Sequence, residues 1–283
     1  MSEFEPHRRL RGVLLTRRSA FQIYCANRLW ERGAIDMVIF EEGQSHVEER
    51  ALSGDLAKKL RGSLRLLVRP LAVFHKAHSL LNRRKYFGFQ QLHDERVLES
   101  GYSAVAPGLA TLTVPSVNSD QVLETLRRHD PQIVFVFGTA LIGDAVMDCV
   151  SAPFVNMHWG WSPNYRGEGI VTALAHEGAG ALGVTVHALD AGIDSGAILY
   201  RARPQVEAGD NFYAIGLRLS RLGTECFAEC AQRLRAGQAL TGVPQERGVG
   251  AFRGSKYMRE HPEIYLKAWR NLLRASGETR GGT

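Results

Sequence analysis

The run Ile133-Val134-Phe135-Val136-Phe137 is apolar at every position, and turn-forming residues bound it on both sides. Asp130-Pro131 stands before it, and Gly138 follows it. A short apolar run rich in β-branched and aromatic residues is typical of a strand buried on both faces of a parallel sheet. The sequence therefore predicts a central parallel strand at residues 133–137.

Strand and helix patterns alternate on both sides of this run. Residues 12–16 form a second apolar strand pattern, and Ser19 and Gln22 then have the spacing of a capping box at the start of a helix. That helix ends near Gly33, and a strand pattern follows at once. Strands are expected at residues 35–40, 111–114, 154–158, 183–189 and 198–206, and helices begin near residues 118, 169 and 210. The alternation predicts an α/β fold: a Rossmann-like, doubly wound, mostly parallel sheet.

Residues 45–100 interrupt the alternation and predict a helical insertion, kinked at Pro70. We expect residues 1–237 to form one catalytic domain that includes the insertion. Residues 238–283 are expected to form a short, partly helical C-terminal extension. The helical pattern from residue 55 to residue 81 indicates either a cover for the sheet or a contact in a homodimer. Arg65 and Arg69 within it argue against a membrane span.

Charge is concentrated in the same insertion. Residues 45–100 carry eleven Lys and Arg against six Asp and Glu, in a chain whose net charge is +6. Such a cluster is either a solvated helix face or a surface for a polyglutamylated ligand, a nucleotide or an acidic partner. No recognised nucleic-acid-binding module accompanies it, so we expect no nucleic-acid partner.

Composition narrows the class of protein further. The chain has 283 residues, 45% of them hydrophobic, which is enough to bury a sizeable core. Its four cysteines form neither a disulfide framework nor a Cys-x-x-Cys knuckle, and no secretory signal precedes the first strand, so a cytoplasmic location is expected. His75 and His78 lack a nearby carboxylate or thiol partner, and we expect no metal. The turn from Thr16 to Ser19 has no glycine, which argues against a nicotinamide enzyme.

Polar residues gather where two of these strand patterns end. Asn156 and His158 are two residues apart at the end of an expected strand, so their side chains leave on the same face. Asp194 lies between Gly192 and Gly196 in a loop after a later strand. Ligands of open α/β sheets bind at the carboxyl ends of strands. We expect the fold to bring these three side chains together.

An amide, an imidazole and a carboxylate suit the attack of an amine on an acyl carbon. The carboxamide and a charged imidazole donate hydrogen bonds to the developing oxyanion, worth about 3–4 kcal/mol for each donor. A carboxylate takes up and relays the proton that the amine loses and the leaving group gains. This chemistry needs no nucleophilic cysteine.

The motifs also resemble a known family. Asn156-Met157-His158, the turn Tyr165-Arg166-Gly167 and the loop Gly192-Ile193-Asp194-Ser195-Gly196 resemble the signature of formyltransferases that use 10-formyltetrahydrofolate. The resemblance runs from about residue 131 to about residue 234 and is weak over the first 40 residues. It implies that Asn156, His158 and Asp194 are the catalytic trio.

The resemblance further implies where the two substrates bind. The pteridine ring of the folate would lie against Gly138, Thr139, Ala140, Leu141, Ile142, Asp190, Gly192 and Ile193. The amine would enter past Tyr165 and Arg166, and Arg166 would either hold an acidic group of the acceptor or form a salt bridge within the loop. Where relatives have His-Pro, this chain has His158-Trp159-Gly160-Trp161, and we expect Trp159 and Trp161 to shape the acceptor pocket.

Several branches of this family are possible. Methionyl-tRNA formyltransferases carry a further β-barrel domain, which we do not expect from the residues after Gly237, and the phosphate loop of glycinamide ribonucleotide enzymes is missing near Thr16. The expected activity is N-formyl transfer from 10-formyltetrahydrofolate to an amine of a small metabolite, either an amino sugar nucleotide or an amino-acid-derived amine of secondary metabolism. A formyltetrahydrofolate hydrolase and a non-catalytic folate- or nucleotide-binding protein are the alternatives.

Overall fold

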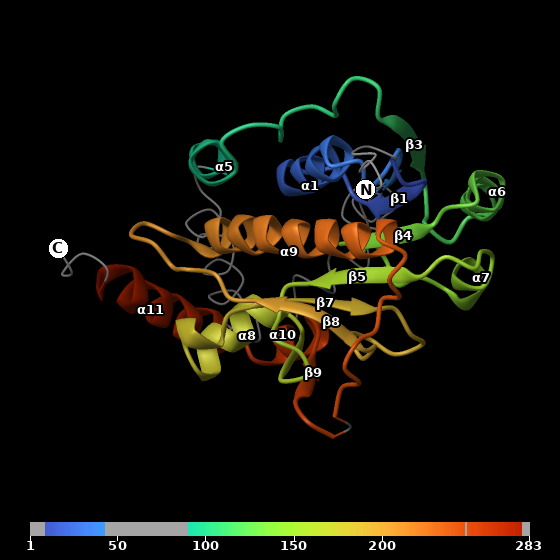
Figure 1. Cartoon of the computed structure of the whole chain (residues 1–283). Coiled ribbons are helices and arrows are strands. Elements are labelled where there is room, and N and C mark those ends of the chain that lie inside the picture. The colour runs from blue at the N-terminus through green and yellow to red at the C-terminus, as the bar shows by residue number, and fades with distance from the viewer. Residues whose placement is uncertain (1–8, 43–89, 247, 279–283) are drawn as a thin grey trace, which may run out of the picture.

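A seven-stranded sheet forms the centre of the protein, in the order β3-β2-β1-β4-β5-β7-β8 (Figure 1). The computed structural model describes residues 9–42, 90–246 and 248–278. The strands are β1 (Gly12–Thr16), β2 (Met37–Glu41), β3 (Ala110–Val114), β4 (Ile133–Phe137), β5 (Phe154–His158), β7 (Val184–Ala188) and β8 (Ile198–Ala202). Strands β1 to β5 pair in parallel, whereas β7 and β8 are antiparallel. The predicted mostly parallel α/β sheet is confirmed.

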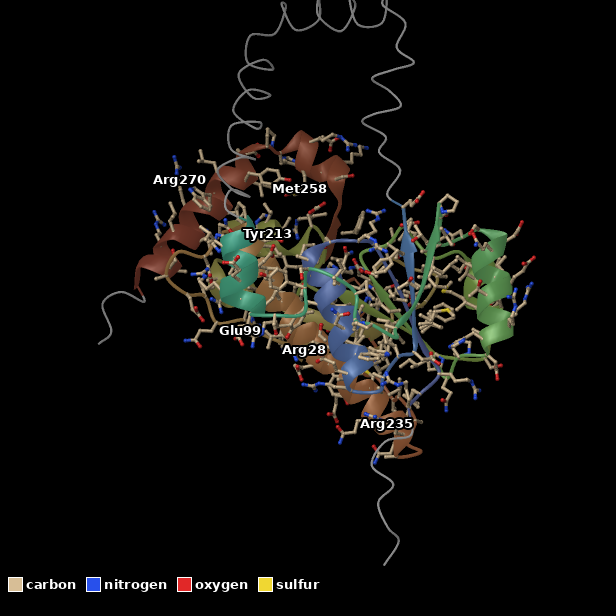
Figure 2. All side chains as sticks on the ribbon, turned by 90° about the horizontal axis from the view of Figure 1, so that it is seen from above. Arg28, Glu99, Tyr213, Arg235, Met258 and Arg270 are labelled. Atoms are coloured by element: carbon tan, nitrogen blue, oxygen red, sulfur yellow. The ribbon has the colours of Figure 1, made fainter. Side chains whose placement is uncertain are left out.

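Helices cover both faces of the sheet (Figure 2). One face carries α1 (Ala20–Glu31) and α9 (Phe212–Arg235), and the other carries α6 (Asp120–His129) and the short α7 (Asp144–Met147). Strand β4 packs alternate side chains into these two cores: Phe135 meets Phe227 of α9 with ring centroids 4.6 Å apart, while Val134 and Val136 face the α6 side. Burial on both faces explains why this strand is apolar at every position.

Two helix starts differ from the capping predicted by the sequence. Helix α1 begins at Ala20 after Ser19, but the Ser19 hydroxyl caps no amide and Gln22 donates to Phe137 O instead, at 3.3 Å. Helix α9 is capped by Asn211, whose side chain accepts from Ala214 N at 2.9 Å. Asp210, near which the sequence places the start of this helix, instead accepts from Arg96 of α5 (Gln90–Leu98) and from Arg218 of α9 itself. Other partners thus hold Gln22 and Asp210, while the Ser19 hydroxyl has no hydrogen-bond partner among the described residues.

The chain after α9 folds back onto the rest of the domain. Strand β9 (Ala251–Arg253) pairs in parallel with β6 (Tyr165–Gly167), and α10 (Ser255–Glu260) follows it. Helix α11 (Glu263–Glu278) packs on α8 (Gly169–His176), next to the 3-10 turn Ala179–Ala181. In the structure, α11 shares the main core with α8 and α9. The division of the chain at residue 237 stays a prediction.

Two further expectations concern the insertion and the membrane. Of the predicted insertion, α5 is described and packs against α1 and α9, whereas Pro70, His75 and His78 lie outside the described residues. Over the part of the chain that is described, no helix is both long and apolar enough to cross a membrane.

Candidate active site

The loop after β4 is held by two side chains from neighbouring strand ends. Glu41 at the end of β2 is buried, and its carboxylate accepts from Ala140 N at 2.8 Å and from Val117 N at 3.2 Å. Asn118 donates to Leu141 O at 2.8 Å and accepts from Gly143 N at 2.7 Å. With its backbone fixed in this way, the loop leaves the Leu141 side chain 68% exposed. Residues 138–142 thus form a rigid loop with an open apolar side chain.

Strand β5 presents Asn156 and His158 on the same face, as expected. His187 of β7 stands directly opposite Asn156 in the antiparallel register, and Asn156 Nδ2 lies 3.1 Å from His187 Nε2. His187 Nδ1 is 2.8 Å from Ala188 O, a carbonyl that can only accept. In the neutral ring the proton therefore lies on Nδ1 and Nε2 accepts from Asn156, whereas in the protonated ring Nε2 also carries a proton and faces the Asp194 carboxylate at 3.7 Å.

The ring of His158 is oriented by the turn that follows it. His158 Nε2 donates to Tyr165 O at 2.8 Å, which leaves Nδ1 for other partners. A Cβ atom at Gly160 would lie 2.3 Å from His158 Nε2 and 2.1 Å from Tyr165 O. Only glycine at position 160 leaves room for this hydrogen bond. Thr185 of β7 fixes the same turn, donating to Gly160 O at 2.6 Å.

Asp194 completes the cluster from the loop after β7. Its carboxylate lies 3.4 Å from His158 Nδ1 and 3.7 Å from His187 Nε2, and it accepts from Gly167 N at 3.1 Å. The two imidazole contacts have ion-pair lengths and are longer than strong hydrogen bonds. Asp194 has a positive φ of 53°, a conformation that Asp adopts more readily than most residues. The structure therefore brings Asn156, His158 and Asp194 together, and adds His187.

Burial and charge oppose each other in this cluster. Burial lowers the pKa of His158 below its ordinary value, and the nearby Asp194 carboxylate only partly offsets this. Burial by itself would raise the pKa of Asp194, but His187, His158 and the Gly167 amide together lower it. At neutral pH the site therefore holds an ionised Asp194 beside a largely neutral His158.

The remaining loop residues place a second apolar side chain near the surface. Asp190 accepts from Gly192 N at 3.1 Å and from the Ser195 hydroxyl at 2.8 Å, which closes a tight turn. Ile193 in this turn is 38% exposed. Each of the two loops predicted to hold the pteridine thus carries one exposed aliphatic side chain.

The turn after His158 sends the two indoles in different directions. Trp159 packs against Phe21 of α1 and Phe137 of β4, with ring centroids 5.0 and 5.7 Å apart. Trp161 instead lies beneath two guanidinium groups of the β8 segment, those of Arg201 and Arg203, at 4.5 and 3.8 Å from its centroid. These contacts are with core and β8 residues, and an acceptor-binding role for either indole stays a prediction.

Tyr165 and Arg166 also leave in opposite directions from β6. Tyr165 is buried, its hydroxyl donates to Glu177 at 2.5 Å, and its carbonyl orients His158. Tyr165 also lines a small pocket of about 250 Å³ together with Glu177, and its role at the entrance of the acceptor stays a prediction. The Nε atom of Arg166 is buried and has no hydrogen-bond partner within the described ranges. A salt bridge of Arg166 within its loop, one of the two predicted roles, is not formed with any described residue.

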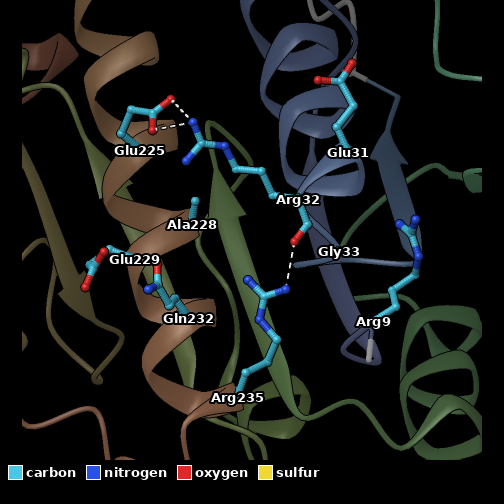
Figure 3. A pocket seen from close by; sticks show the side chains of 9 residues that line it. All are labelled: Arg9, Glu31, Arg32, Gly33, Glu225, Ala228, Glu229, Gln232 and Arg235. Atoms are coloured by element: carbon cyan, nitrogen blue, oxygen red, sulfur yellow. Dashed lines mark hydrogen bonds and ion pairs between the residues drawn. The ribbon is translucent and has the colours of Figure 1, made fainter. Parts of the chain in front are cut away.

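A separate cleft of about 660 Å³ lies between the C-terminal ends of α1 and α9 (Figure 3). Its charges are largely paired: Arg32 lies 2.7 Å from Glu225, and Arg235 donates to Arg32 O at 2.9 Å. None of the predicted site residues lines it. These pairs join the two helices, and the cleft is distinct from the cluster around Asp194. Across the described ranges, no group of three or more His, Cys, Asp or Glu side chains is arranged to hold a metal ion.

Comparison with known proteins assigns the family. A sequence model described as formyl transferase matches residues 84–230, just over half of the chain. The chain belongs to the formyl transferase family. The chain is 26% identical to the methionyl-tRNA formyltransferase of Kosmotoga olearia over 146 residues, which are 51% of this chain and 47% of the relative. It spans about half the length of the curated relatives it matches.

Solved structures share the fold of this chain. A 4-N formyltransferase from Francisella tularensis aligns with a TM-score of 0.53 and 10% identity, covering 94% of this chain and 88% of that one. Glycinamide ribonucleotide transformylase 1 from Symbiobacterium toebii aligns with a TM-score of 0.52 and 15% identity, covering 86% and 100%. At these identities the likeness concerns the fold alone.

Three of the residues that organise the site were missed by the sequence reasoning. His187, Glu41 and Asn118 lie on strands or loops whose pairing only the fold decides. A signal for His187 was present, since it is the one ionisable residue in β7, whose other residues are valine, threonine and alanine. Nothing local distinguishes Glu41 or Asn118 from ordinary polar residues at a strand end or a turn.

Proposed function

We propose that this protein transfers the formyl group of 10-formyltetrahydrofolate to an amine of a small metabolite, either an amino sugar nucleotide or an amino-acid-derived amine. The observation that carries the proposal is the convergence of Asn156, His158 and Asp194 at the carboxyl end of β5. Membership of the formyl transferase family supports the proposal that the transferred group is a formyl group. The amide, imidazole and carboxylate of the cluster support the proposed mechanism of its transfer.

The two loops beside the cluster fit the formyl donor. Residues 138–142 and the turn of Asp190, Gly192 and Ile193 would hold a flat pteridine, with Leu141 and Ile193 supplying apolar contact. Hydrogen bonds to Glu41 and Asp190 already hold the backbone of these two loops in place. When bound, the folate supplies a formyl carbon that is ready for attack. The protein contributes orientation and the handling of charge and protons.

Asn156 is placed to stabilise the negative charge on oxygen. One of its two amide protons is directed at His187, and no partner for the other is found among the described residues. As the amine nitrogen bonds to the formyl carbon, electrons move onto the formyl oxygen. The second amide proton of Asn156 donates to that oxygen, a contribution of about 3–4 kcal/mol.

His158 and Asp194 move the proton. The attacking nitrogen becomes cationic, and neutral His158 accepts its proton at Nδ1, the ring nitrogen that faces Asp194. The carboxylate stabilises the imidazolium that results. Cleavage of the bond between the formyl carbon and the folate nitrogen then returns this proton to the folate. The products are a formamide and tetrahydrofolate, with no covalent enzyme intermediate.

The likeness to methionyl-tRNA formyltransferases favours aminoacyl-tRNA as the second candidate acceptor. For a small acceptor, the support is that the described residues after Gly237 fold onto β6 and α8. They cover the same surface that the turn of Tyr165 and Arg166 borders. We therefore keep the small amine as the proposal and include tRNA in the test.

The experiment supplies 10-formyltetrahydrofolate with amino sugar nucleotides, amino-acid-derived amines, methionyl-tRNA or no acceptor. Tetrahydrofolate release and formylated product are both measured, the latter by mass spectrometry. Transfer to a small amine supports the proposal. Release without any acceptor indicates a hydrolase, transfer only to tRNA indicates the second candidate, and binding without turnover indicates a non-catalytic folate-binding protein.

Variants then connect the activity to the cluster. His158→Ala and Asp194→Ala should each abolish turnover while the melting temperature stays close to that of the wild type, because both side chains handle charge rather than fill the core. His261→Ala, at a half-exposed histidine in another part of the chain, is the matched control and should stay active. Near-normal turnover of either site variant would show that the mechanism is wrong.

A further inference from the structure

The chain after α9 returns to the site and contacts the Asp194 loop through one side chain. Val243 forms an isolated antiparallel bridge with Ile198, and Gln245 follows two residues later. Gln245 Nε2 lies 2.9 Å from Asp194 O and 2.8 Å from Gly196 O. Because both partners are carbonyl oxygens, the side-chain nitrogen must donate both hydrogen bonds.

We propose that Gln245 is a positioning residue for Asp194: it fastens the backbone on both sides of Ser195 and so keeps the carboxylate between the two imidazoles. The expected effect on formyl transfer rests on the proposed function above. The positioning of Asp194 by Gln245 rests only on the contacts between them.

The Asp194 loop needs such support because its backbone is unusual. Asp194 has a φ of 53°, in the left-handed region that costs a non-glycine residue free energy and persists only where surroundings hold it. Gly196 lies so close to β7 that a Cβ there would be 1.8 Å from Ala188 O. The carboxylate is fixed from its side-chain end by Gly167 N at 3.1 Å, and Gln245 fixes the backbone end.

A role in folding stability alone does not account for this side chain. The Oε1 atom of Gln245 is buried and has no hydrogen-bond partner among the described residues. A buried acceptor without a donor lowers stability, and such mismatches are expected where function rather than stability selects the residue. The amide nitrogen, by contrast, donates two hydrogen bonds.

Three substitutions at position 245 distinguish the effect of the two donated hydrogen bonds from the effect of side-chain size. Gln245→Leu keeps the size and removes both donors, whereas Gln245→Glu places an oxygen opposite two carbonyl oxygens. Gln245→Asn keeps the donor on a side chain one carbon shorter, and serves if the leucine variant does not fold. Gln238→Leu, at an exposed glutamine in the same segment, is the matched control.

The first measurement is steady-state kinetics with melting temperature. In Gln245→Leu and Gln245→Glu, kcat/KM should fall by roughly ten- to a hundredfold, the effect of displacing a catalytic group by about 1 Å. The loss should lie mainly in kcat, since Asn156 and the 138–142 loop are untouched. Gln238→Leu should match the wild type.

The second measurement is independent of activity and follows the titration of His158 by NMR, with the resonance assigned from its loss in His158→Gln. The groups that face Asp194 are His158 of β5, His187 of β7 and the Gly167 amide of β6. A loosened Asp194 supports the imidazolium less, so the pKa of His158 should shift downward in Gln245→Leu, which adds no charge of its own. Were the wild type inactive, the proposed function would fail while this titration still decided the role of Gln245. An unchanged His158 titration in folded Gln245→Leu, with or without lost activity, overturns the inference.

Discussion

At the scale of single residues, the site depends on one imidazole whose two nitrogens have different tasks. His158 Nε2 is committed to Tyr165 O, so only Nδ1 faces Asp194 and the open side of the cluster. The sequence reasoning expected a charged imidazole that donates to the oxyanion. The structure favours a ring that begins neutral, because burial outweighs the attraction of the carboxylate. Asn156 is then the main donor to the oxygen.

The opposing effects of burial and of Asp194 on the pKa of His158 predict what happens when the Asp194 charge is removed. Asp194 raises the pKa of His158 while burial lowers it. Asp194→Asn removes only the raising effect, so the pKa of His158 should move further down from its already lowered value, and the ring should stay neutral to lower pH. NMR titration of the assigned His158 signal measures this.

Asp190→Asn is the control for this titration, because Asp190 lies in the same loop but bonds to Gly192 N and Ser195 instead of His158. It should leave the pKa of His158 nearly unchanged. An upward shift in Asp194→Asn would mean that the carboxylate does not stabilise the imidazolium, and that the proton is handled elsewhere.

At the scale of secondary-structure elements, α11 is an integral part of the domain although it follows the predicted boundary. Met258 of α10 and Ile264, Ala268 and Leu272 of α11 belong to the same core as α8 and α9. Asn271 donates to Leu174 O at 2.7 Å, at the C-terminal end of α8, which joins the two helices by a polar contact as well. The helix therefore covers α8 as a structural layer.

Two adjacent leucines of α11 test this packing. Leu272 is fully buried and Leu273 is 49% exposed. Leu272→Ala should lower the free energy of unfolding by about 2–5 kcal/mol through lost burial and a cavity, whereas Leu273→Ala should change it by less than about 0.5 kcal/mol. Chemical denaturation gives both values. Equal effects of the two substitutions would show that α11 does not pack on α8 as described.

Elements and side-chain partners differ in how well the sequence predicts them. The strand at 133–137 was predicted at its observed bounds, because burial on both faces leaves an unbroken apolar run. The strand at 154–158 was also predicted at its observed bounds, although Asn156 and His158 interrupt its apolar residues. The pairing of Asn156 with His158 also follows from strand geometry alone. The directions of Gln22, Trp159 and Trp161 do not follow from local sequence, since contacts distant in sequence decide where these side chains point. The Ser19 hydroxyl caps no amide, and the acceptor pocket expected of the two indoles stays a prediction. Gln245 lies 51 residues beyond Asp194, and no local pattern connects them.

At the scale of the whole molecule, the candidate site is built from segments that are distant in sequence. Strand β5, the loop after β7 and the segment around Gln245 each supply one part of the site, while β2 fixes the neighbouring loop through Glu41. The four free cysteines include three whose pKa burial raises to about 11 or 12, those of Cys25, Cys226 and Cys230, so these thiols stay protonated at neutral pH. The proposed reaction relies on none of them.

The proposed reaction predicts how the protein responds to chelators. Asn156, His158 and Asp194 supply both charge stabilisation and proton transfer, so the step needs no Lewis acid. Formyl transfer should therefore survive dialysis against a chelator at its original rate. The measurement compares dialysed protein with and without added zinc, and includes a mock-dialysed sample as control. A rate lost on dialysis and restored by zinc would contradict this.

The pairing of β1 with β4 has a consequence for the order in which the molecule can fold. Gly12 of β1 pairs with Ile133 of β4, so β1 meets one of its two neighbouring strands only after more than a hundred intervening residues have been made. Contacts so distant in sequence form slowly, because a long loop must close first. Until then β1, with its run of valine and leucine, has an open edge on which another chain could pair. During synthesis this protein therefore passes through a stage in which a strand that ends up fully buried has an edge open to pairing with another chain.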